Sequence, residues 1–167
     1  AFVEGGHDFL LTFHHPRVPI ALDPALYPAL VVGADALVAV RRADAGDAAA
    51  PMLRYAPDSY LGRLTASVRT PPEPAGDGPV HVNENAMAEA LKYMVLAGHG
   101  QAWLPRSLIE RELDSGALVA EDASIALEIR LYRNGERRRP VLDQVWQAAQ
   151  DELAHVWVQA DAHAGRE

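Results

Sequence analysis

The chain has 167 residues, 49% of them hydrophobic, which is enough for one large domain or two small lobes with a proper core. Its formal net charge of -8 argues against a protein that grips nucleic acid directly, because phosphate contacts need lysine and arginine. The absence of cysteine excludes disulfides, thiol catalysis and thiol redox sensing.

No apolar run approaches the ~20 residues that a membrane-spanning helix needs, so no membrane partner is expected. No signal peptide is recognisable, and we expect a cytoplasmic protein. The chain starts Ala-Phe-Val-Glu-Gly-Gly, without an initiator methionine or a helix cap. It is therefore expected to be a piece of a longer protein.

The first part of the chain contains several short apolar runs. Residues 7–13, HDFLLTF, are predicted to form a buried strand that His14-His15-Pro16 ends. Residues 30–32 and 36–40 are predicted to form two further strands. Residues 43–51, which are small, polar or proline, indicate a linker that crosses between lobes.

The middle of the chain alternates strands with helices. Residues 52–55 are predicted to form a strand, and Asp58 or Ser59 is expected to cap the helix that follows. Residues 80–82 predict another strand. Asn85 is expected to cap the next helix, whose apolar residues recur at the helical spacing.

Glycine residues mark the ends of the predicted helices in the segment that follows. Gly98 is expected to stop the second helix, before a short buried strand at residues 101–104. Ser107 and Glu110 have the spacing of a capping box for the third helix. Gly116 is expected to end that helix.

The last third predicts one strand and one long helix. Alternating apolar residues at 125–131 indicate a strand with one core face. Pro140 marks the start of the helix, and the tail after Val158 is expected to fray. The expected apolar stripe of this helix is Leu142, Val145, Trp146, Ala149, Leu153 and Val156.

Strands that alternate with helices predict a mainly parallel sheet with helices on both sides. The linker near 43–51 and the strand near 125–131 indicate two crossings between lobes. Two crossings predict a hinge with a cleft between the lobes.

Three segments together resemble the effector-sensing domain of LysR-type transcriptional regulators: GGHDFLLTF, YPALVVGADALVAV and AGHGQAWLPRSLIERELDSGALV. Sequences of domains in that family commonly contain, in this order, a glycine-rich turn, an apolar strand ending in Leu-Pro, a helix and the motif Gly-x-Leu-Val. The resemblance extends over roughly residues 2–156. Within the family, HHP after the first strand, MAEALKYMVLAGHG and the lack of thiols are most similar to the hypochlorite-responsive branch.

The resemblance implies an α/β fold like that of type 2 periplasmic binding proteins, with two α/β lobes, a hinge and an incomplete lobe one. The implied divisions are 1–43 (partial lobe one), 44–123 (lobe two), 124–158 (return strand and C-terminal helix of lobe one) and 159–167 (flexible tail). The family's DNA-binding region is absent, as are the first strand, first helix and second strand of lobe one. The lobe-one sheet should therefore have an unprotected edge.

The function implied by the resemblance is sensing of a small-molecule effector or an oxidant in the inter-lobe cleft. Transcription would be controlled through an N-terminal DNA-binding domain that this chain lacks, in a homo-oligomer, and no cofactor is expected. The alternative is a solute-binding protein of a transport system, which shares the fold. Enzyme activity is not expected, because neither GxSxG nor a glycine-rich phosphate loop is present.

Ligands of open α/β sheets bind at the carboxyl ends of strands and at helix N-termini. On that basis the expected effector-binding residues are Thr12, His14, His15, Asp58, Ser59, Asn83, Glu84, Asn85 and Gly98. The alternatives are ordinary capping at Ser59 and Asn85, and backbone geometry at Gly98.

Two further hypotheses concern metal binding and oxidation. His14 and His15 could form a metal pair, but no ligand spacing such as HExxH is present and neighbouring strand residues point to opposite faces, so no metal site is expected. Met87 sits on the first turn of its helix, where oxidation to the sulfoxide would turn an apolar contact polar. The alternative is that Met87 and Met94 fill the core of an amphipathic helix.

Overall fold

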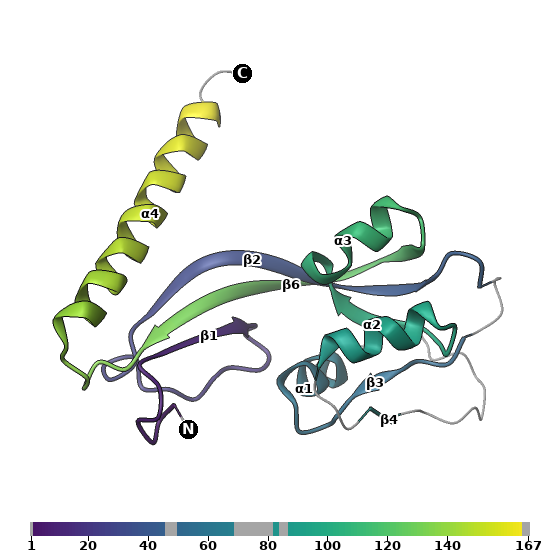
Figure 1. Ribbon diagram of the computed structural model, residues 1–167, viewed down its shortest axis with the longest axis horizontal. Helices are drawn as coiled ribbons and strands as arrows, with labels where there is room; N and C mark the ends of the chain where they lie inside the picture. The colour runs from purple at the N-terminus through teal and green to yellow at the C-terminus, as the bar shows by residue number, and fades with distance from the viewer. Residues whose placement is uncertain (1, 46–49, 69–81, 84–86, 165–167) are drawn as a thin grey trace. The chain divides into compact units, whose positions relative to one another are not determined.

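The computed structural model describes residues 2–45, 50–68, 82–83 and 87–164 (Figure 1). For residues 82–83 and 155–164 only the backbone is described. The chain packs into two units. Unit 1 consists of Ala1–His14, Ile20–Ala34 and Glu128–Glu167, and unit 2 consists of His15–Pro19 and Asp35–Leu127.

The strands and helices follow the alternation that the sequence predicts. In chain order they are β1 (Phe9–His14), β2 (Ala29–Arg42), β3 (Arg54–Tyr55), α1 (Tyr60–Ser67), β4 (Val82–Asn83), α2 (Ala88–Leu96), β5 (Ala102–Pro105), α3 (Arg106–Asp114), β6 (Leu118–Arg133) and α4 (Pro140–Ala164).

The two long strands, β2 and β6, each pass from one unit into the other (Figure 1). β2 is continuous, so the prediction of two separate strands at 30–32 and 36–40 is wrong. Gly33 does not interrupt β2 because it lies against Ile129 of the neighbouring β6, where an added Cβ would make an ordinary contact at 3.5 Å. The expected lobe boundaries at 43/44, 123/124 and 158/159 stay predictions.

The larger sheet is built on antiparallel pairs. Its strand order is β1-β6-β2-β5, with Phe9 of β1 opposite Arg133 of β6, and Leu37 of β2 opposite Pro105 of β5. β3 and β4 pair in parallel in a separate two-stranded sheet. The prediction of a mainly parallel sheet is therefore wrong. The long strands β2 and β6 are also neighbours that run in opposite directions (Figure 1).

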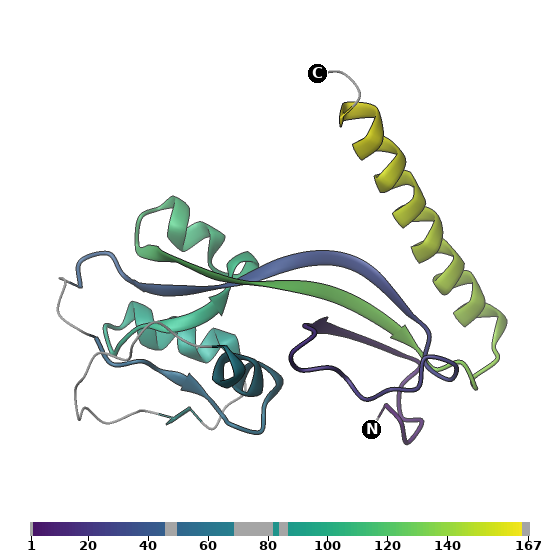
Figure 2. The same cartoon turned by 180° about the vertical axis from the view of Figure 1, so that it is seen from behind.

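Unit 2 holds the larger core. Residues 37–40 of β2 are all buried, which shows that both faces of the strand are covered there. Helices α2 and α3 both pack on β5, and α1 and α2 pack on β3 (Figure 2). The largest fully buried side chains are Leu37, Val40, Leu64, Leu91, Val95, Leu104, Ile109 and Leu118.

Unit 1 has a smaller core on one face of its strands. Phe2, Tyr27 and Tyr132 form a buried cluster. The sheet order ends at β1 among the described strands, as expected for an edge, and Leu11 of β1 is 63% exposed. A sheet edge of this kind is open to pairing with another chain.

Helix α4 starts at Pro140, as predicted. It continues to Ala164, beyond Val158, where the sequence predicted the tail to begin. Its predicted apolar stripe is interrupted, because Leu142 is buried but Val145 is 47% exposed. None of the helices among the described residues is long and apolar enough to span a lipid bilayer.

Candidate functional site

The helices of unit 2 begin at one edge of its strands. α1 follows β3, α2 follows β4 and α3 follows β5. These three strands point the same way, since β3 pairs in parallel with β4, and Met52, just before β3, bridges in parallel to Gln101. The N-termini of the three helices therefore share the carboxyl edge of the strands, where unpaired backbone N–H groups favour anions and polar ligand atoms.

At the start of α1, the helix is capped by Ser59, which is one of the two residues, Asp58 and Ser59, that the sequence predicted for this position. Its Oγ accepts a hydrogen bond from the Gly62 N–H at 3.0 Å and donates one to the Ala56 carbonyl at 2.7 Å. Asp58 is exposed beside it. The hydroxyl of Ser59 is thus engaged in capping, while no acidic residue lies in the first turn of α1.

The start of α3 is capped by a residue from another strand. Asp35 of β2 accepts hydrogen bonds from the Ser107 N–H at 3.3 Å and the Ser107 hydroxyl at 2.6 Å. Pro105 is the N-cap residue and provides no side-chain cap. The predicted capping box of Ser107 and Glu110 is therefore wrong, because the Ser107 side chain points to Asp35. The negative carboxylate compensates the positive end of the helix dipole.

The start of α2 differs from the other two. Met87 occupies the N-cap position that the sequence assigned to Asn85, and its side chain makes no capping hydrogen bond. Glu84 and Asn85 lie outside the described residues, and Asn83 ends β4 opposite Tyr55. Because Met87 is 58% exposed, the reading of Met87 as a core filler is wrong.

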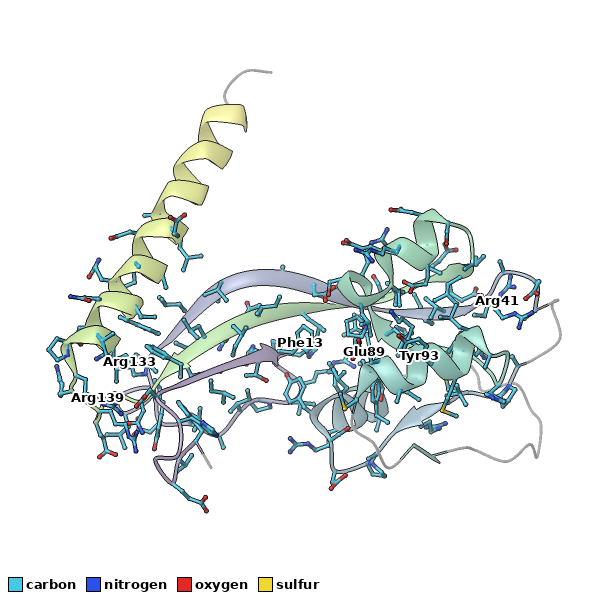
Figure 3. All side chains as sticks on the ribbon, in the orientation of Figure 1. Phe13, Arg41, Glu89, Tyr93, Arg133 and Arg139 are labelled. Carbon is cyan, nitrogen blue, oxygen red and sulfur yellow. The ribbon has the colours of Figure 1, made fainter. Side chains whose placement is uncertain are left out.

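Helices α2 and α3 are joined by a partly buried ion pair. Lys92 Nζ lies 3.1 Å from Glu112 Oε1, and the two side chains are 12% and 21% exposed. Lys92 also donates to the Leu108 carbonyl at 3.4 Å. Its hydrogen bond lowers the pKa of Glu112. Glu89 and Tyr93 lie on the same helix as Lys92 (Figure 3), and the Tyr93 side chain is exposed.

The core of unit 2 contains a buried phenol, that of Tyr55. The Tyr55 hydroxyl donates to the Trp103 carbonyl at 2.9 Å. Burial raises the pKa of Tyr55 far above its usual value, so the phenol stays protonated. Tyr55 therefore supplies neither a negative charge nor a general base.

Gly98 lies at the opposite edge of the unit 2 strands. It follows the C-terminus of α2 with a φ of +83°, and its N–H bonds to the Val95 carbonyl while the His99 N–H bonds to the Met94 carbonyl. These two bonds make a left-handed helix stop that favours glycine. The prediction that Gly98 stops α2 is confirmed. Its grouping with residues at helix N-termini is wrong, since Gly98 follows a helix rather than preceding one.

Thr12 and His14 lie in β1 and His15 follows it, and all three have partners within the chain. Thr12 donates through its hydroxyl to the Phe13 carbonyl at 3.4 Å. His14 Nδ1 lies 3.4 Å from Glu128 Oε2 on β6, whereas His15 Nδ1 accepts from the Arg17 N–H at 3.1 Å. Among the described residues, no group of three His, Asp or Glu side chains is arranged to hold a metal ion. Effector contact by these three residues stays a prediction.

Comparison with known proteins shows to which family the chain belongs. A family model for the LysR substrate binding domain matches residues 5–154. The chain belongs to the LysR substrate-binding-domain family. The expected fold class, an α/β fold like that of type 2 periplasmic binding proteins, is confirmed.

Two curated relatives of this LysR domain are bacterial regulators. The HTH domain-truncated transcriptional regulator QseD of Escherichia coli O157:H7 is 34% identical over 99 residues, which cover 58% of this chain and 40% of QseD. The HTH-type transcriptional regulator YjiE of Escherichia coli K12 is also 34% identical over 99 residues, which cover 58% of this chain and 32% of YjiE. The chain thus spans less than half the length of either relative.

Solved structures similar to this LysR domain include HypT from Salmonella typhimurium. Its bromide-bound regulatory domain matches with a TM-score of 0.72 at 25% identity, covering 92% of this chain and 75% of that one. Full-length HypT, described as a hypochlorite-specific LysR-type transcriptional regulator, matches with the same TM-score and identity over 92% of this chain and 54% of that one. These relatives are transcriptional regulators, and they give no support to a transport protein.

Proposed function

We propose that this LysR domain senses an effector and controls transcription through a DNA-binding domain in another part of the same protein. The observation that carries the proposal is the family match over residues 5–154. A sensory domain needs groups that bind its effector, and the carboxyl edge of unit 2 offers backbone N–H groups at helix N-termini. In this proposal the chain is cytoplasmic, acts as a homo-oligomer and reaches DNA only through that other domain.

The sequence of the reading frame upstream of Ala1 tests this function. We expect a winged helix-turn-helix followed by a long linker helix. An apolar signal segment with a small-residue cleavage site would overturn the proposal and favour the solute-binding alternative.

Within unit 2, the N-terminus of α1 is the proposed contact for the effector. Asp35 compensates the start of α3, and Glu89 lies in the first turn of α2, whereas the first turn of α1 has no acidic residue. The backbone N–H group of Leu61 precedes the one that Ser59 caps, and as one of the first groups of a helix it has no partner within that helix. The bromide-bound state of the HypT regulatory domain supports a small anion as the kind of group that binds.

The finer proposal is a response to hypochlorite through Met87. It is supported by the resemblance to HypT and by the exposure of the Met87 side chain at the start of α2. Oxidation to the sulfoxide would place a polar acceptor beside the unpaired N–H groups of that helix. The effect would be a change in the stability of the first turn of α2.

Stoichiometric oxidation tests the role of Met87. We expect hypochlorite to oxidise Met87 before Met52 and Met94, because the latter two are only partly exposed. Peptide mapping by mass spectrometry measures the sulfoxide at each position, and Met87→Leu is the matched control. Equal oxidation at all three methionines would contradict a selective switch.

A further inference from the structure

Unit 1 contains an open pocket of about 230 Å³ at the base of α4. It is lined by Ala25, Pro28, Arg133, Gly135, Arg138 and Trp146. The volume lies below the ~300–1,000 Å³ of typical drug-sized sites, which favours a ligand of few atoms.

The two main-chain walls of this pocket are held together by backbone hydrogen bonds. The Arg133 N–H bonds to the Pro28 carbonyl at 3.0 Å, and the Gly135 N–H bonds to the Leu26 carbonyl at 2.8 Å. A Cβ on Gly135 would lie 2.8 Å from the Leu26 oxygen, so this close approach requires glycine. These bonds fix the two main-chain walls relative to each other.

The third wall of the pocket is the aromatic side chain of Trp146. Trp146 of α4 stacks on Phe9 of β1, with ring centroids 6.4 Å apart and ring planes 12° apart. This stacking holds the indole of Trp146 in place, and Trp146 lines the pocket. An indole surface suits a flat apolar group.

The pocket carries positive charge in an acidic protein. Arg137 and Arg139 both pair with Asp8, at 3.0 and 3.2 Å. Arg133 pairs with Asp143 through Nη2, whereas the exposed Arg138 has no ion-pair partner among the described residues. An anion that entered the pocket would find the guanidinium of Arg138 available.

Arg133 supplies a second, buried donor. The residue is 9% exposed, and no described residue accepts a hydrogen bond from its buried Nε. Because that nitrogen has almost no accessible surface, a ligand in the pocket would meet another part of the Arg133 side chain, which lines the pocket. Arg133 lies where β6 ends, near the start of α4 (Figure 3).

We propose that this pocket binds a small carboxylate with a flat apolar body. The carboxylate would pair with the guanidinium groups of Arg133 and Arg138, and the apolar body would lie against Trp146 and Pro28. The site lies wholly within unit 1, so it is separate from the contact proposed at α1 in unit 2 and does not depend on it.

Benzoate and its neutral analogue benzamide are the probes that test this site. In NMR spectra of the full chain, benzoate should shift the Arg133 Nε–H and Trp146 indole N–H signals with saturation, and benzamide should bind at least about fivefold more weakly. Equal binding of the two probes would overturn the proposal. So would the absence of shifts at Arg133 and Trp146 up to tens of millimolar benzoate.

Three variants localise the binding. Arg138→Gln should weaken benzoate binding by about two- to fivefold at low salt, the range of an exposed charge pair. Arg139→Gln removes the same charge one residue away, outside the pocket lining, and should change the affinity by less than about twofold. Equal losses in these two variants would indicate unspecific attraction and contradict a built site.

Asp143→Asn should tighten benzoate binding by about two- to fivefold, because it removes the carboxylate that competes for Arg133 while keeping an oxygen that accepts from Nη2. A gain in affinity cannot result from misfolding. Unchanged or weaker binding in a folded Asp143→Asn protein would count against the role of Arg133. None of these outcomes bears on the N-terminus of α1.

Discussion

At the scale of single residues, Asp35 is the side chain that most changes the interpretation of unit 2. It interrupts an otherwise apolar stretch of β2, and its carboxylate binds both the N–H and the hydroxyl of Ser107. A carboxylate at a helix N-terminus combines a hydrogen bond with a favourable interaction with the helix dipole. Asp35 therefore fixes the start of α3 and makes that helix end a poor anion site.

A double-mutant cycle between Asp35→Ala and Ser107→Ala tests this contact. We expect a coupling free energy of about 1 kcal/mol, measured from urea unfolding of the two single variants and the double variant. The matched control pairs Ser107→Ala with Glu110→Ala, which should show coupling near zero. A larger coupling with Glu110 would restore the capping box and contradict the structure.

At the scale of elements, the Lys92–Glu112 ion pair joins α2 to α3. Both side chains are mostly buried, and the Lys92 hydrogen bond lowers the pKa of Glu112 in the folded protein. Because the folded pKa lies below the unfolded one, the pair stabilises the fold at and above the unfolded pKa of about 4.3. That contribution is lost as the pH falls through the lowered pKa of Glu112.

The variant that tests the Lys92–Glu112 ion pair is Glu112→Gln. At pH 7 it should lower the free energy of unfolding by up to about 1 kcal/mol, as expected for a partly exposed pair. The difference from the unaltered protein should shrink as the pH falls below about 4. Urea unfolding at a series of pH values measures it, with the exposed Glu110→Gln as the control. A difference that grows toward acid pH would contradict the sign of the pKa shift.

At the scale of the whole molecule, the features predicted from the sequence are those that depend on neighbouring residues. Ser59 caps α1, Gly98 and Gly116 end α2 and α3 with positive φ, and Pro140 starts α4. Each of these needs only a local turn or cap, and residue type alone indicates it.

The features that the sequence did not predict depend on distant partners. Ser107 looks like half of a local capping box, but its partner Asp35 lies 72 residues away. β2 continues through Gly33 because β6 supports it, and Val145 is exposed because unit 1 covers only part of α4. The pocket at Arg133 likewise arises from segments more than 100 residues apart in sequence, such as Pro28 and Trp146.

The measurement that tests the central claim most directly is a bromide titration of the isotope-labelled chain by NMR. If the start of α1 is the contact through which this LysR domain senses small anions, the largest saturating shift should fall on the backbone N–H group of Leu61. The N–H of Ser107, whose helix end Asp35 already compensates, should change little. Shifts that spread evenly over the surface, or that centre on Ser107 instead, would contradict this account.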